Sequence, residues 1–400
     1  MSIHRALKTR SVSSIITIIG VILVATNLRA PITSLGPVLG EIQNAFSLSP
    51  SALGGLNALP LLLFSVLSLI APYLGKVFSL ERVIACSLCL IMAGIVYRSS
   101  GWISGLWYGT IVLSFGIAFC NVLLPSLVKR DFPSRAGSIT GFYAAAMAAT
   151  AGLSAGISAP LSQVFSMQGW KWSLGIWALL AFLSLMIWLP QIKGIQHRLD
   201  LNKSKKNNES PQISPWKKGV GWQVSLFFAF HSFVFYAIVD WFPSYASTFG
   251  ISSSTSGAYL MIYQVVAIST NLATVPLIRI FKNQMGIGFI CGLLLFIGGM
   301  GLLFLPKISL LWMIVAGLGA GMSMVTSLSL FILRTNDYYQ AAKLSGMAQC
   351  IGYLGAALGP LLIGILHDMT NEWFIPLMLI PAASILVMVF ATLAGRSRVI

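Results

Sequence analysis

Acidic side chains are scarce in this chain of 400 residues, where nine Asp and Glu residues stand against 25 Lys and Arg residues. Charged residues of both signs amount to only 8%, whereas soluble globular domains contain roughly a quarter. Hydrophobic residues make up 57% of the chain. This balance excludes a soluble globular protein and predicts an all-α protein that crosses a membrane many times.

Histidine and cysteine are also few, with four and five residues. Cys86 and Cys89 form a CxxC pair inside an apolar stretch, but no second pair and no nearby histidine completes a metal or redox motif. Paired histidines, carboxylate clusters with catalytic spacing and nucleotide-binding glycine loops are all lacking. We therefore expect no metal, no cofactor and no enzymatic activity, and a membrane enzyme or sensor is only a remote alternative.

Long apolar runs occupy most of the chain. A hydrocarbon core of about 30 Å needs roughly 20 helical residues, and runs near that length recur twelve times. They lie near residues 12–40, 52–75, 82–98, 104–128, 136–163, 171–190, 219–246, 256–280, 285–305, 309–333, 343–367 and 373–394. The sequence therefore predicts twelve transmembrane helices.

A polar segment at 191–218 divides these spans into six and six. We expect an N-terminal bundle at 1–190, a linker, and a C-terminal bundle at 219–400. Faint repetition supports this division, because GLSAGISAP at 152–160 and GYLGAALGP at 352–360 occupy corresponding spans of the two halves. Small-residue runs of this kind let helices approach closely and move against one another.

Basic residues predict the orientation of the chain in the membrane. With both termini in the cytoplasm, 21 of the 25 Lys and Arg residues lie on the cytoplasmic side, while Arg98, Lys171 and Lys307 lie in outer loops. This asymmetry satisfies the positive-inside rule. We expect a multi-pass protein of a bacterial inner or plasma membrane with both termini cytoplasmic.

The formal net charge of +16 also raises the question of partners. Because the basic residues are spread over short loops and form no stripe or patch, we expect no nucleic acid partner. Lys203, Lys205 and Lys206 in the linker form a solvated face that favours anionic lipid head groups. We expect a monomer that contacts membrane lipid and a small-molecule substrate.

Arg29 lies well inside an otherwise uncharged predicted span, whereas the other Lys and Arg residues lie at span ends or in loops. On a helix it shares a face with Thr26, Thr33 and Gly36, which predicts a narrow polar stripe turned away from lipid. The alternative is that Arg29 lies near the end of its span and extends its side chain to the membrane surface.

Two prolines favour the functional interpretation of Arg29. Pro31 has no N–H for the carbonyl of Asn27, and Pro37 has none for the carbonyl of Thr33. Irregular backbone at membrane depth is tolerated where it lines a cavity or is buried in protein. We therefore expect Asn27, Arg29 and Thr33 to bind substrate.

Further polar side chains share the estimated depth of Arg29. Counted along each helix at a rise of roughly 1.5 Å per residue, His231 and Gln264 lie at a depth in the membrane close to that of Arg29. Asp240 is expected at the outer interface. We predict substrate contacts from a set of further residues, namely Asn121, His231, Tyr236, Gln264 and Gln349. His231 is the first candidate for proton coupling, and Asp240 is the second. The alternative for each of these polar residues is that it forms hydrogen bonds between helices and does not contact substrate.

The charge of the predicted cavity indicates the class of substrate. Residues 12–40 contain Arg29 and no carboxylate, so a small anion, or a neutral molecule with an acceptor edge, fits better than a cation. A proton-coupled multidrug exporter is the alternative. An exporter of cations needs a carboxylate deep in one half, and Asp240 is expected too near the outer surface.

Several motifs resemble the cyanate and 2-nitroimidazole porters of the major facilitator superfamily, and the resemblance runs along most of the chain. The motifs are NLRAPITSLGP at 27–37, LLPSLVKRDF at 123–132, WFP at 241–243 and KLSGMAQCIGY at 343–353.

This resemblance implies twelve helices in two pseudo-symmetric six-helix bundles. It also implies alternating access and transport of small anions such as cyanate, or of small nitrogen heterocycles. Asn27, Arg29 and Thr33 match the motif of the first span, Asn121 falls where an amide is typical, and Gln349 matches a glutamine of the eleventh span. Gly75 stands where the superfamily usually has an Asp, which weakens inferences about efflux and gating.

Overall fold

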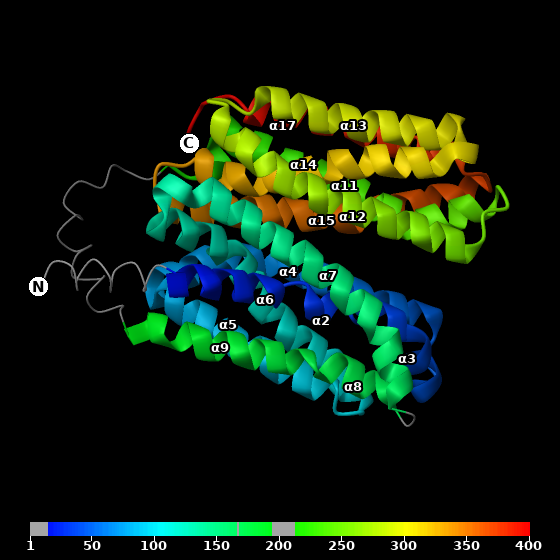
Figure 1. Cartoon of the computed structure of the whole chain (residues 1–400), viewed down its shortest axis with the longest axis horizontal. Helices are drawn as coiled ribbons and strands as arrows, with labels where there is room; N and C mark the ends of the chain where they lie inside the picture. The colour runs from blue at the N-terminus through cyan, green and yellow to red at the C-terminus, as the bar shows by residue number, and fades with distance from the viewer. Residues whose placement is uncertain (1–14, 166–167, 194–212) are drawn as a thin grey trace, which may run out of the picture. The chain divides into compact units, whose positions relative to one another are not determined.

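The structure is a computed structural model that describes residues 15–165, 168–193 and 213–400 (Figure 1). Within these residues, twelve segments are helical, long and apolar enough to cross a membrane, and no β-strand occurs. The prediction of an all-α protein with twelve spans is confirmed. The basic cluster before residue 15 and most of the predicted linker lie outside the described residues.

The observed helix ends agree with the predicted spans to within several residues. Residues 15–26 form the first helix. The following α-helices are α2 (Ala30–Thr33), α3 (Leu39–Phe46), α4 (Pro50–Phe78), α5 (Leu80–Arg98), α6 (Ile103–Asp131), α7 (Ala136–Val164), α8 (Gly169–Gly175), α9 (Trp177–Lys193), α11 (Gly219–Ser247), α12 (Ser253–Ile280), α13 (Met285–Phe304), α14 (Ser309–Leu333), α15 (Tyr338–Thr370), α16 (Phe374–Leu377) and α17 (Leu379–Ala394). Short 3₁₀ turns lie between some of them, and η1 (Gly36–Val38) falls inside the first span.

The chain forms two compact units. The first contains the described residues up to Val128 and those from Ala146 to 193, and the second contains Lys129–Ala145 and Ile213–Ile400. In the first unit α5 packs on α4, α8 and α9, and in the second α11 packs on α15 and α17 while α14 packs on α12 and α13. The predicted division into bundles at 1–190 and 219–400 stays a prediction.

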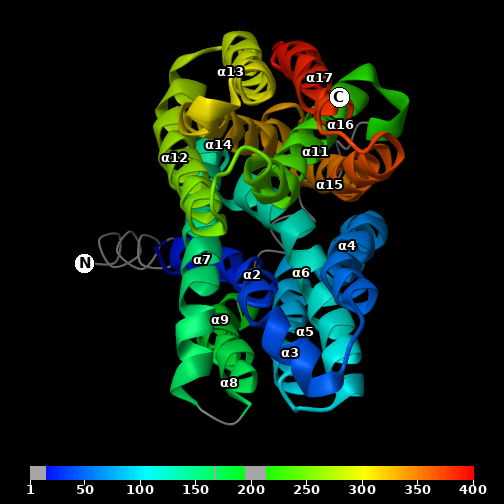
Figure 2. The same ribbon diagram turned by 90° about the vertical axis from the view of Figure 1, so that its right-hand side faces the viewer.

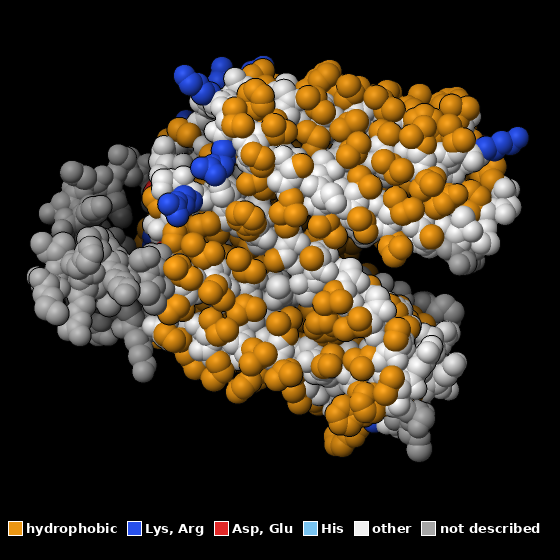
Figure 3. All heavy atoms as spheres, viewed as in Figure 1, with side chains coloured by type: hydrophobic (Ala, Val, Ile, Leu, Met, Phe, Trp, Pro, Cys, Tyr) orange, Lys and Arg blue, Asp and Glu red, His pale blue; other side chains and the backbone are white. Residues whose placement is uncertain are grey.

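Apolar side chains cover the outer faces of the spans. Leu62, Val66 and Tyr73 on α4 are exposed, as are Met261 and Val265 on α12. In the space-filling view hydrophobic side chains cover the lengths of the helices, and Lys and Arg side chains lie near helix ends (Figure 3). A surface of this kind suits contact with lipid tails.

Glycines bring α5 and α6 into close contact in the first unit. The Cα of Arg98 lies 2.7 Å from where a Cβ on Gly109 would be, and the backbone N of Arg98 is nearer still. A Cβ on Gly94 would lie 2.8 Å from the carbonyl oxygen of Gly109. The two helices are therefore held at backbone contact along this line, and they lie side by side in both ribbon views (Figures 1 and 2).

Replacing Gly109 by alanine is expected to destabilise the protein by about 1–3 kcal/mol, because the added methyl group overlaps the backbone of Arg98. Gly152 in α7 has no neighbouring atom within 4 Å of the added Cβ, so Gly152→Ala is the matched control and is expected to be neutral or slightly stabilising. Thermal unfolding of both purified variants in detergent checks this. Equal melting temperatures for the two variants would contradict the close contact.

Candidate functional site

The first span is broken where the sequence places Arg29. Residues 15–26 are helical, 27–29 form a turn, and α2 begins at Ala30. At the break the backbone N–H of Asn27 donates to the carbonyl of Val24 at 3.1 Å, a three-residue spacing tighter than that of an α-helix. Pro31 cannot supply the N–H that would continue the helix to the carbonyl of Asn27, which agrees with an interruption here.

Arg29 caps the short helix that follows the break. Its carbonyl accepts three hydrogen bonds of 3.0 Å, from the backbone N–H groups of Ile32 and Thr33 and from Oγ1 of Thr33. Its side chain is half-buried. The backbone of Arg29 therefore fixes the turn at which the helix is interrupted.

Thr33 links this turn to α7. Its Oγ1 lies 2.6 Å from Oγ of Ser154, and Ser154 is itself buried in α7. The predicted stripe of Thr26, Arg29, Thr33 and Gly36 does not lie on a single helix. The hydroxyl of Thr33 instead positions α2, which places Thr33 beside Arg29 as a structural support.

Asn27 is fully buried and only partly satisfied. Its Nδ2 donates to the carbonyl of Leu23 and to Oγ of Ser184 on α9, both at 2.7 Å. The carbonyl of Leu23 can only accept, which supports the assignment of Nδ2 to this side of the amide. The remaining Oδ1 is buried without a hydrogen-bond partner. Asn27 thus ties two helices together and retains one acceptor atom.

The second unit holds another set of predicted residues. His231 on α11 is 4% exposed, and its Nδ1 is buried without a hydrogen-bond partner. Gln349 on α15 is also buried, and its Nε2 donates to Oγ of Ser345 at 2.9 Å. Tyr236 is half-buried, and its ring meets the edge of Phe235 at 5.4 Å between centroids.

Tyr263 was missed by the sequence analysis. It is fully buried on α12, its hydroxyl has no hydrogen-bond partner, and its ring lies 5.9 Å from that of Phe235. The ring of Phe235 in turn lies 6.3 Å from the imidazole of His231. The predicted Gln264, one residue further along, is exposed. Tyr263 is therefore the interior polar residue of this part of α12.

Two predicted residues lie apart from these clusters. Asn121 is half-buried on α6, in the first unit. Asp240 is exposed in the last part of α11, three residues before Pro243, and its position at the membrane surface stays a prediction.

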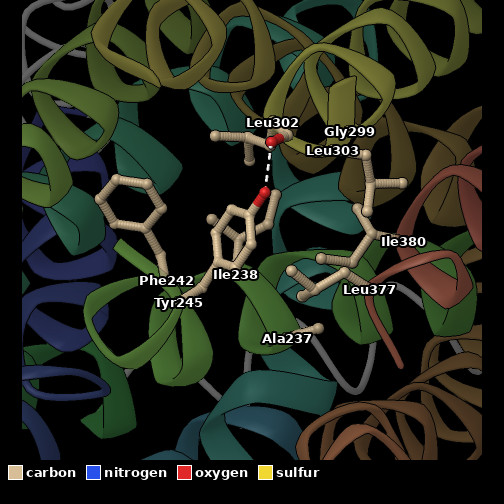
Figure 4. Close-up of a pocket in the computed structure, with 9 residues that line it drawn as sticks. All are labelled: Ala237, Ile238, Phe242, Tyr245, Gly299, Leu302, Leu303, Leu377 and Ile380. Atoms are coloured by element: carbon tan, nitrogen blue, oxygen red, sulfur yellow. Dashed lines mark hydrogen bonds between the residues drawn. The ribbon is translucent and has the colours of Figure 1, made fainter. Parts of the chain in front are cut away.

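An apolar pocket in the second unit contains none of the predicted residues (Figure 4). Its free volume is about 10 Å³, close to the smallest space that holds one water molecule. The hydroxyl of Tyr245 points toward the carbonyl of Leu302 and donates to it at 2.7 Å, so this polar group is already paired (Figure 4). The pocket is lined by Ala237, Ile238, Phe242, Tyr245, Gly299, Leu302, Leu303, Leu377 and Ile380. It is a packing void and not a substrate site.

In the part of the chain that the structure describes, no group of three His, Cys, Asp or Glu residues is arranged to hold a metal ion. Within the first unit, Asn27 and Arg29 instead provide an amide with one unpaired acceptor atom and a permanent positive charge. An arrangement of this kind is suited to binding a small polar or anionic molecule.

Comparison with known sequences shows relatives along the whole chain. The chain is 38% identical to "Uncharacterized transporter YycB" of Bacillus subtilis (strain 168), over 98% of this chain and 96% of that protein. It is 36% identical to the 2-nitroimidazole transporter of Escherichia coli (strain K12), over 96% of each. It is 26% identical to the cyanate transport protein CynX of the same organism, over 88% of this chain and 90% of that protein.

Among solved structures, a double Trp mutant of XylE matches with a TM-score of 0.77, over 94% of this chain and 95% of that one, at 14% identity. Identity this low shows a shared fold alone. A sequence profile described as "Major Facilitator Superfamily" matches residues 17–360. The relatives and the fold are those of transporters and not of enzymes, and the predicted resemblance is confirmed. With its twelve membrane-crossing helices, the chain belongs to the Major Facilitator Superfamily and is a multi-pass secondary transporter similar to the 2-nitroimidazole and cyanate transporters.

Proposed function

We propose that this transporter carries a small anion, or a small polar nitrogen compound with an acceptor edge, by alternating access. The observation that carries the proposal is the half-buried Arg29 at the break of the first span. A guanidinium offers a planar fork of N–H donors that grips two acceptor atoms at once. Cyanate and the nitro group of a nitroimidazole both present acceptor atoms of this kind.

Asn27 supports the second class of substrate. The Oδ1 of Asn27 has no hydrogen-bond partner and is free to accept one from a substrate. Asn27 belongs to the same turn as Arg29. A heterocycle that carries both an acceptor edge and an N–H group can use both residues, whereas cyanate uses only the guanidinium. The names of the 2-nitroimidazole and cyanate relatives fit these two classes.

The proton-coupled exporter of cationic drugs is less well supported. Asp240 is the only carboxylate among the described residues of α11 and α12, and it is exposed near the end of its helix. An exporter of cations needs a carboxylate deep in one half, and Asp240 does not supply it.

Ligand-dependent thermal unfolding tests the proposal directly. A ligand present at about 100 times its Kd stabilises the native state by about 2.7 kcal/mol. We expect cyanate or 2-nitroimidazole to raise the melting temperature of the wild-type protein but not of Arg29→Gln. Lys307→Gln removes an exposed charge elsewhere and should respond as the wild type does. A response to cationic drugs alone would favour the exporter.

We propose that the protein lies in the bacterial inner or plasma membrane with both termini in the cytoplasm. In a cysteine-free background, a cysteine at position 248, which is exposed just after α11, should react with a membrane-impermeant thiol reagent in intact cells. A cysteine in place of Ser204, in the linker, should react only after the cells are opened. The reverse pattern would overturn this topology.

A further inference from the structure

A second arginine is enclosed within the first unit. Arg98, the last residue of α5, has an exposed fraction of 0%, although the sequence analysis placed it in an outer loop. None of its three guanidinium nitrogens has a hydrogen-bond partner. The end of α5 lies at backbone contact with Gly109 of α6.

Another buried arginine of the same chain shows the usual arrangement. Arg334 is 4% exposed, and its Nε donates to the carbonyl of Ala394 at 2.7 Å. Its Nη2 donates to Oε1 of Gln284 at 2.5 Å and to the carbonyl of Gly395 at 2.9 Å. Arg98 has no comparable acceptor from the protein.

Among the described residues of the first unit, no acidic side chain pairs with Arg98. The described residues of this unit contain two acids, Glu41 and Glu81. Glu81 begins α5, and at about 1.5 Å per residue the length of the helix separates it from Arg98 by roughly 25 Å. Glu41 accepts a hydrogen bond from Oγ of Ser162 at 2.5 Å.

Further unpaired donors belong to the neighbouring helix α8. Trp170 is 2% exposed, and its indole Nε1 has no hydrogen-bond partner. Trp170 packs in the same buried cluster as Leu106, which lies one turn before Gly109 on α6. Nζ of Lys171 lies 5.9 Å from the ring centroid of Trp170 and against Gly101. This end of the unit therefore carries excess positive charge and unsatisfied N–H groups.

A guanidinium in a protein does not lose its proton, so burial cannot make Arg98 neutral. An ion buried without a partner costs several kcal/mol, which is large relative to the stability of a folded protein. We propose that a small inorganic anion of halide size binds Arg98 inside the first unit, with the indole N–H of Trp170 as a second donor. The anion is small because the site is enclosed, and it is a bound structural ion distinct from the substrate at Arg29.

Anion-dependent thermal unfolding of the full-length protein tests this site. At constant ionic strength, sodium chloride replaces sodium gluconate, whose anion is too large for an enclosed site. The melting temperature of the wild type should rise with chloride and saturate. Arg98→Met should lose this dependence, and its melting temperature in gluconate should equal or exceed that of the wild type because the unpaired charge is gone.

Three controls separate the site from other anion effects. Arg29→Gln should keep the chloride dependence, since its charge lies elsewhere, and Lys307→Met should keep it as well. Trp170→Phe should weaken the apparent chloride affinity about tenfold, as expected for the loss of one hydrogen bond to an ion. If Arg98→Met does not fold, the response of the wild type and of Trp170→Phe still tests the proposal.

Two results would overturn it. One is a wild-type melting temperature that does not respond to chloride, and the other is a response lost in Arg29→Gln but kept in Arg98→Met.

Discussion

Replacing Arg29 by alanine is expected to lower the initial rate of substrate uptake into proteoliposomes by about a hundredfold or more. Truncating one member of a buried charged contact typically costs about 2–5 kcal/mol, and 1.4 kcal/mol is a factor of ten. The backbone carbonyl of Arg29, which the substitution keeps, accepts the three hydrogen bonds that fix the turn, so we expect the amount of folded protein to stay close to that of the wild type.

Arg29→Lys should restore little of this activity. Lysine keeps the charge but lacks the planar fork that binds two acceptor atoms. Lys307→Ala, which removes an exposed charge from an outer turn, is the matched control and should transport normally. Uptake by Arg29→Ala at the wild-type rate would show that Arg29 only extends to the membrane surface.

His231→Gln is expected to uncouple transport from a pH gradient. His231 is buried on α11 with an unpartnered Nδ1, and glutamine keeps a polar side chain but cannot titrate. If this imidazole carries the proton, the variant should exchange labelled substrate without a gradient at close to the wild-type rate. Accumulation driven by an imposed pH gradient should fall at least about tenfold, to the equilibrium level.

Asp240→Asn is the control for that experiment, because Asp240 is the other candidate carrier and is exposed. Accumulation that survives in His231→Gln and is lost in Asp240→Asn would place the proton at the outer end of α11. If accumulation survives in both variants, neither residue carries the proton. If a pH gradient drives no accumulation even in the wild type, the protein works as a uniporter or an anion exchanger.

The number and limits of the spans could be predicted because their signal is long and uniform. About 20 apolar residues are needed for each crossing, and the chain supplies twelve such runs. The break in the first span was only partly predictable. Pro31 and Pro37 indicated freed carbonyls, but the turn at 27–29 depends on which donors remain nearby.

It was harder to predict which polar residues face the protein interior and which face lipid. In a soluble helix the buried face is the apolar one, but in a membrane the lipid-facing side is equally apolar, so periodicity does not separate the two. The sequence therefore favoured Gln264, whereas Tyr263 is the buried neighbour.

The burial of Arg98 could not be predicted from the sequence either. Its position at the end of an apolar run is typical of an outer loop. Gly109 on α6 lies against Arg98, and Gly105 lies against Tyr97 and Ser100, so the two glycines form a G-x-x-x-G pattern that permits close helix approach. That pattern was present in the sequence, but the partner helix that it contacts could not be identified from one chain alone.

Substrate counterflow tests the central claim most directly. Proteoliposomes are loaded with unlabelled cyanate or 2-nitroimidazole and diluted into a trace of the same labelled compound, with no pH gradient and no membrane potential. The wild-type protein should transiently concentrate the label for at least one of these compounds, and Arg29→Ala should not, although both proteins are folded. Absence of counterflow with either compound in the wild type, together with counterflow of a cationic drug that persists in Arg29→Ala, would contradict a transporter that binds its substrate through Arg29.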